Sequence, residues 1–143
     1  MESQIATFED ATLILKLYEL RREAVLRKAR HWLIFEFNPA TIEEYRSVAG
    51  ASGTEHNDYL RQVLSYWEMA ASLVVHGAVK ADLFLDSNGE GIFIFAKFHA
   101  FRDDIQAKTG RPFMRHTAQL IEKYPAAREI FNAMLKSVQA RSS

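Results

Sequence analysis

The sequence predicts an all-α fold, a compact array of about six helices around one central helix at about 56–76. Apolar residues recur at spacings of three, four and seven, as on the buried stripes of helices. Turn residues are scarce, with six glycines and three prolines in 143 residues. No segment has a second segment with which to pair as a sheet. We expect residues 1–143 to form one domain of ordinary size, with 1–7 and 141–143 as frayed ends.

The first expected helix begins after Thr7, whose hydroxyl can cap the opening turn, and runs as one piece to about Phe37. Asn38-Pro39 ends it, because the residue before a proline avoids helical backbone angles. Arg22 lies within the apolar stripe that we assign to the inner face of this helix. The members of the stripe are Ala11, Ile14, Leu15, Tyr18, Val25, Ala29, Trp32 and Leu33.

The central helix has the clearest pattern. Its apolar residues follow the spacing of a helical seam at Leu60, Val63, Trp67, Ala70 and Val74. Apolar residues on both sides widen this stripe, which predicts a helix that touches several neighbours. Gly77 is placed to stop it. A short helix over residues 42–49 is expected before it, and a helical turn over 80–86 after it.

The C-terminal half contains the one ambiguous segment, Gly91–Phe98, whose β-branched and aromatic residues also suit a strand. We interpret it as part of a helix that ends at Gly110, because apolar residues continue at helical spacing beyond it. Pro112 is expected to open the next helix. Tyr124-Pro125 separates that helix from the last one.

The charge balance argues against a nucleic-acid partner, since 18 basic and 18 acidic residues cancel. The basic residues of the first helix alternate with Glu19 and Glu23, which indicates a solvated face, with nucleic-acid binding as a third and weakest hypothesis. These basic residues are Arg21, Arg22, Arg27, Lys28 and Arg30. The absence of cysteine excludes disulfides and thiol chemistry and is compatible with a reducing cytosol.

No segment predicts a membrane span or a secretory signal. The longest apolar run, Ile92–Ala96, is far shorter than the ~20 residues that a spanning helix needs. The first residues lack the basic start and apolar centre of a signal peptide. We therefore expect a cytoplasmic protein.

The sequence contains no motif that predicts catalysis or a cofactor. No histidine has a glutamate three residues before it, as a di-iron bundle would require. Gly89-Glu90-Gly91 lacks the preceding strand and the third glycine of a dinucleotide loop. His99 and Asp103 share one helix face, and a solvated pair is favoured over a metal site. We expect no catalytic residue, cofactor or metal.

Three charged residues form the candidate site, because each lies on or beside an apolar helix face. Arg22 lies within the stripe of the first helix, Glu68 borders that of the central helix, and Arg102 flanks that of the next long helix. Partly buried charges need partners. We predict an interhelical network in which Glu68 pairs with one or both arginines, beside Tyr66 and Trp67. A structural ion pair is favoured over a ligand pocket.

Several short motifs together resemble a bacterial all-helical domain family of unknown function. They are Leu17-Tyr18-Glu19-Leu20-Arg21-Arg22, Tyr66-Trp67-Glu68-Met69-Ala70, Gly77 with Asp82-Leu83-Phe84, and Arg102. The resemblance covers roughly residues 8–125. It implies a helical fold and a meaningful Glu68–Arg102 pair, and it implies no agreed activity. Members of the family are sometimes preceded by membrane-spanning segments.

Two functions from different classes remain open on the sequence alone. The first is a non-catalytic helical module that binds a protein partner or a second copy of itself, with Trp32, Phe93 and Phe95 as surplus aromatic contacts. The second is a bundle that binds an anionic small molecule, or acts on one, in a pocket near Trp67, Glu68 and Arg102.

Overall fold

The computed structural model describes residues 5–141, which are helical with short connections and contain no strand. The all-α class is confirmed. The expected number of helices, about six, is wrong, because the described residues form nine α-helices. They are α1 (Phe8–Arg21), α2 (Ala24–His31), α3 (Ile42–Ala49), α4 (Glu55–Val75), α5 (Ala81–Ser87), α6 (Glu90–Lys97), α7 (Arg102–Thr109), α8 (Arg115–Lys123) and α9 (Pro125–Arg141). Of the frayed ends expected at 1–7 and 141–143, residues 1–4 and 142–143 lie outside these residues.

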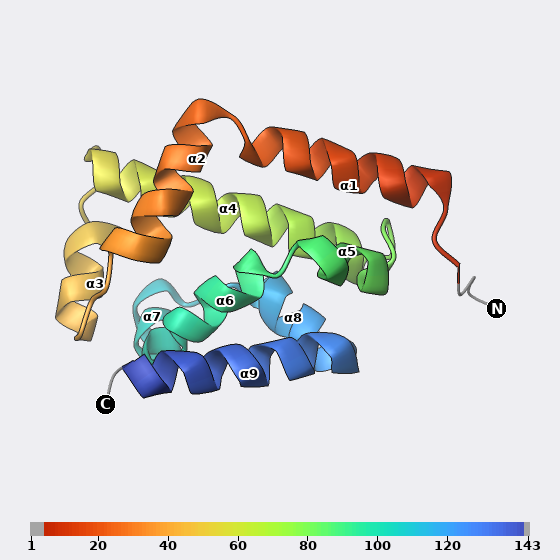
Figure 1. Cartoon of the computed structure of the whole chain (residues 1–143). Helices are drawn as coiled ribbons and strands as arrows, with labels where there is room; N and C mark the ends of the chain where they lie inside the picture. The colour runs from red at the N-terminus through yellow and green to blue at the C-terminus, as the bar shows by residue number, and fades with distance from the viewer. Residues whose placement is uncertain (1–4, 142–143) are drawn as a thin grey trace.

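Helix α4 runs through the middle of the molecule, as the sequence predicted. Figure 1 shows α1 and α2 on one side of it and α6, α8 and α9 on the other. It has buried residues along its whole length, among them Leu60, Val63, Trp67, Ala70 and Val74, which are at most 3% exposed. Gly77 follows its last turn with a φ of 82°, a left-handed angle that favours glycine.

The expected first helix is broken at Arg22-Glu23 into α1 and α2. The backbone of Glu23 leaves the helical region, at φ −54° and ψ 139°. Its carboxylate then accepts hydrogen bonds from the amides of Val25 and Leu26 and caps α2. Glu23, whose place in the charge pattern suits an unbroken helix, thus caps the start of α2 instead. Further on, Trp32–Glu36 forms a π-helical turn, η1, instead of continuing the α-helix.

The break changes which side of α1 faces the core. Its buried residues are Asp10 and Leu17, whereas Leu15 and Tyr18 of the expected inner stripe are exposed. Arg22 is exposed as well. In α2 and η1 the stripe is correctly assigned at Ala29, Trp32 and Leu33, which are buried, and wrongly at Val25, which is 49% exposed. A wheel drawn through residues 22–23 therefore gives the wrong face for the first half.

The long helix expected over 91–109 is also divided. It consists of α6, a 3-10 turn at His99–Phe101 (η2), and α7. The ambiguous segment is helical, as predicted, and its Ile92, Ile94 and Phe95 belong to the core. Phe93 is half-buried and Trp32 is only 7% exposed. The three aromatic residues expected as surplus contacts are thus packed against the protein itself.

Helix α8 begins at Arg115, not at Pro112 as expected. Met114 precedes it with a φ of 46°, in the left-handed region. The opening amides of the helix, at His116 and Thr117, donate to the carboxylate of Glu68 at 2.9 and 3.0 Å. The start of α8 is thus fixed by a cap from a side chain of another helix. The residues around Pro112 contain no pattern that predicts such a cap.

Candidate functional site

A cluster of polar side chains lies around Glu90, the first residue of α6. Arg30 of α2 binds its carboxylate with two hydrogen bonds, from Nε at 2.7 Å and from Nη2 at 2.8 Å. Trp67 of α4 donates its indole N–H to the same carboxylate at 2.8 Å. One carboxylate therefore joins three helices, and the two-point geometry with Arg30 fixes their relative orientation.

Arg21 and Tyr66 extend this cluster toward α1. Arg21 donates from Nη1 to the side-chain oxygen of Asn88 at 2.9 Å, and its guanidinium lies 5.9 Å from the ring centre of Trp67. Tyr66 donates its hydroxyl to the carbonyl of Leu17. Burial raises the pKa of Tyr66, while the nearby arginines act in the opposite direction. The phenol therefore stays a neutral donor at ordinary pH.

Gly91 allows α6 to approach Trp67 closely enough for the hydrogen bond between the Trp67 indole and Glu90. A side-chain carbon added at Gly91 would lie 3.2 Å from Cβ of Trp67, tighter than most such contacts in proteins. The Gly-x-Gly around Glu90, which does not fit a nucleotide loop, thus includes a glycine that the packing of two helices explains.

The Glu90 cluster satisfies its own charges. The side chains of Arg30 and Glu90 are 21% and 19% exposed, and each has the other as a counter-ion. The hydrogen bond to Glu90, opposed by burial, raises the pKa of Arg30. With both carboxylate oxygens bonded to protein donors, the cluster acts as an interhelical ion pair and leaves little capacity for an outside ligand.

The structure brings together only two of the five residues predicted from the sequence, Tyr66 and Trp67. Glu68 instead faces α8, where its carboxylate also accepts from the hydroxyl of Thr117 at 2.8 Å and lies 3.3 Å from the ring of His116. Within residues 5–141, no ion pair joins Glu68 to Arg22 or Arg102.

The two arginines of the expected network are exposed and lie in other environments. The Arg22 guanidinium is 5.4 Å from the ring centre of Tyr18. Arg102 donates to the carbonyl of His99 at 2.8 Å. It lines a cleft near η1 and the end of α9, which neither Trp67 nor Glu68 lines. The arginines of the Glu90 cluster are instead Arg21 and Arg30. Both belong to the basic residues of the first helix that we had interpreted as a solvated face.

The outer face of α1 is the clearest apolar surface of the described chain. We use this name for Phe8, Ala11, Leu15 and Tyr18, which follow one another at helical seam spacing on the side opposite Leu17. Phe8, Leu15 and Tyr18 are 85%, 65% and 46% exposed. Single exposed apolar residues are ordinary, but an aligned row of them often marks an interface.

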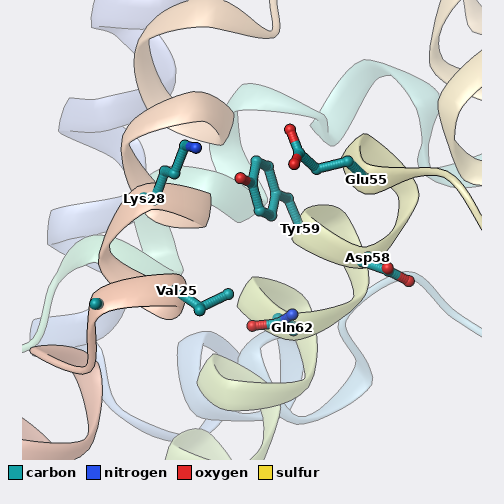
Figure 2. Close-up of a pocket in the computed structure, with 7 residues that line it drawn as sticks. Val25, Lys28, Glu55, Asp58, Tyr59 and Gln62 are labelled. Carbon is teal, nitrogen blue, oxygen red and sulfur yellow. The ribbon is translucent and has the colours of Figure 1, made fainter.

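A groove between α2 and α4 is a second surface feature, shown in Figure 2. Its volume is about 580 Å³. Tyr59 projects from α4 toward α2 and is its one buried lining residue, whereas Lys28, Glu55 and Asp58 are exposed. Since it combines both charge signs in open solvent, the groove indicates no particular ligand chemistry.

Two further findings bound the chemistry of the described residues. In residues 5–141, no group of three or more histidine, aspartate or glutamate side chains is arranged to hold a metal ion. No helix within the same range is long and apolar enough to cross a membrane.

A family model described as "Domain of unknown function (DUF4760)" matches residues 6–124. Comparison with curated proteins finds no match. Comparison with solved structures finds none either.

Proposed function

The chain belongs to this domain family of unknown function, and we propose that it is a non-catalytic interaction module that self-associates through the outer face of α1. The observation that carries the proposal is the aligned exposure of Phe8, Leu15 and Tyr18 on one helix. Burial of such side chains is the main driving force of association.

The position of α1 is fixed by contacts on its inner side, so its outer face is presented by a rigid helix. At the start, Asp10 accepts from the amide of Lys80 at 3.0 Å. In the middle, Tyr66 donates to the carbonyl of Leu17. At the end, Arg21 donates to Asn88. A helix held at three points cannot roll its outer apolar row into the core.

A second copy of this chain is the occupant that fits this face. In an antiparallel pair of α1 helices, Phe8 of one copy lies opposite Tyr18 of the other, and the small Ala11 opposite the larger Leu15. The small and large side chains are therefore complementary in a two-fold arrangement.

The available area suits a weak dimer. Covering the outer face of α1 in two copies removes on the order of 1,000 Å² of total surface, near the lower limit for a specific interface. We therefore expect a monomer–dimer equilibrium that depends on protein concentration rather than an obligate dimer.

Sedimentation velocity or light scattering over a wide concentration range tests the proposal. The wild type is expected to show concentration-dependent dimers, and Leu15→Glu is expected to be monomeric throughout, because it places a charge in the centre of the interface. Phe35→Glu is the matched control. Phe35 is 67% exposed, close to the 65% of Leu15, and it lies in η1 away from α1.

Both variants are expected to keep the helical circular dichroism of the wild type, because both side chains are exposed. A wild type that stays monomeric at the highest concentration contradicts the proposal. So does a dimer that Leu15→Glu leaves intact.

A further inference from the structure

We propose that a second site, independent of α1, binds an amphipathic anion, a carboxylate with an apolar body. The site is a cleft between η1, the segment from α6 to the start of α7, and the last turns of α9. We call it the basic cleft. Its volume of about 930 Å³ lies in the range of small-molecule sites, roughly 300–1,000 Å³.

The charges that line the basic cleft are of one sign. Lys97, His99, Arg102 and Arg141 supply three cations and one imidazole, and none of the lining residues is a carboxylate. The chain as a whole has no net charge, so the asymmetry is local. Same-sign groups that converge on a cleft with apolar walls attract an anion from solution.

Lys97 is the cation that most needs a partner. Its ammonium is half-buried and donates to the carbonyls of Leu33 and Ile34 in the π-helical turn, at 2.7 and 3.1 Å. Within residues 5–141, no carboxylate lies within ion-pair distance of it. Burial, and then the charge of Arg141, lower the pKa of Lys97 to about 8. A bound anion would offset both effects.

His99 adds a polar group that is incompletely satisfied in the same wall. Its ring packs against Phe95 and Phe131, with centres 5.3 and 5.1 Å away. Its Nδ1 atom is buried and has no hydrogen-bond partner in the structure. Arg102 donates a hydrogen bond to the backbone carbonyl of His99. The cleft thus holds cations that have no carboxylate partner among residues 5–141, together with a ring nitrogen that has no hydrogen bond.

The remaining walls are apolar, which selects an amphipathic anion over a bare one. Phe93, Phe98 and Phe101 come from the side of α6 and η2, Leu135 comes from α9, and Ile34 comes from η1. A hydrocarbon body in contact with these side chains gains from burial, while its carboxylate lies toward Lys97 and Arg102.

Titration calorimetry with decanoate, below its micellar concentration, tests the proposal, with inorganic phosphate as the probe that lacks an apolar body. We expect decanoate to bind and phosphate to bind at least tenfold more weakly. Lys97→Met keeps the apolar stem and is expected to weaken decanoate binding on the order of tenfold. Arg102→Gln, at an exposed position that the fold does not need, is expected to weaken it severalfold.

Two control variants locate the binding. Lys108→Met removes an exposed lysine of α7 that does not line the basic cleft. Leu15→Glu disrupts the other apolar surface. Both are expected to bind decanoate as the wild type does. The proposal is overturned if decanoate does not bind, if phosphate binds as tightly, or if neither Lys97→Met nor Arg102→Gln weakens binding. The Arg102→Gln result decides the matter if Lys97→Met fails to fold.

Discussion

The Glu90 cluster and the basic cleft both contain a half-buried cation, and they satisfy it in different ways. Arg30 has a carboxylate with two short hydrogen bonds, which, against the effect of burial, raises its pKa. Lys97 has two backbone carbonyls and no counter-ion among residues 5–141, and burial lowers its pKa to about 8. The first cation is paired within the chain, whereas the second leaves its charge open to an outside anion.

This difference separates a structural role from a binding role. A buried ion pair whose members are matched by the chain holds helices in register, and losing one member leaves the other without compensation. A cation that only neutral dipoles solvate is poorly compensated for its lost hydration. The first arrangement is therefore expected to respond in stability, and the second in ligand binding and in titration.

The largest expected effect on stability is that of Glu90→Ala. The change leaves the Arg30 guanidinium and the Trp67 indole N–H without their acceptor. Breaking a buried pair costs ~3–5 kcal/mol, and the one-fifth exposure of these side chains reduces the expected loss to about 2–3 kcal/mol. Urea denaturation followed by circular dichroism measures it.

Glu122→Ala is the matched control for that experiment, because Glu122 is exposed on α8. It is expected to change the free energy of unfolding by less than ~0.5 kcal/mol. An equally small effect of Glu90→Ala would mean that the Glu90 cluster does not stabilise the fold.

A smaller loss is expected for Glu68→Ala, which removes the cap of α8. The carboxylate accepts from two opening amides and from the Thr117 hydroxyl. Loss of a helix cap costs ~0.5–2 kcal/mol, and we expect about 1–2 kcal/mol here because the side chain is only 22% exposed. The same denaturation experiment measures it.

Arg22→Ala and Arg102→Ala distinguish this cap from the network that the sequence suggested. Since both arginines are exposed and neither is paired with Glu68 in the described chain, each variant is expected to lose less than ~0.5 kcal/mol. A loss from either arginine variant as large as that from Glu68→Ala would support the original pairing instead.

The fold was predictable wherever periodicity extended over several turns without interruption. Helix α4 is an example, because its apolar spacing is regular from Leu60 to Val74 and Gly77 ends it. The breaks at Glu23 and Phe98 were not predictable in this way. Glutamate is a good helix former and not one of the preferred cap residues, so its type favours an unbroken helix, although Glu23 caps α2.

The candidate site was predicted in its residue types and not in its partners. A glutamate, arginines and the Tyr66-Trp67 pair do meet between helices, but the acid is Glu90 and the arginines are Arg21 and Arg30. Choosing Arg22 in place of Arg21 turns the assigned side of the helix by 100°, the angle between successive residues. Glu90 was missed because it is the first residue of its helix and precedes the apolar stripe beside which we looked for charged residues.

Lys97→Met at pH 7 is expected to change the free energy of unfolding by no more than about 1 kcal/mol, because relief from burying a charge offsets two lost hydrogen bonds. The pH dependence is more informative. Between a folded-state pKa of about 8 and the ordinary value of 10.5, the unfolded state binds more protons at Lys97 than the folded state. The free energy of unfolding therefore rises with pH in this window.

The wild type is thus expected to gain stability relative to Lys97→Met as the pH is raised from 8 to 10.5, measured by urea denaturation of both proteins. The other titratable or charged groups that line the cleft, His99, Arg102 and Arg141, are present in both, so the difference reports on Lys97. A bound decanoate would raise the pKa of Lys97 and shift the gain to higher pH. A difference in stability that does not change with pH would mean that burial does not lower the pKa of Lys97. The contrast between Lys97 and Arg30 would then disappear.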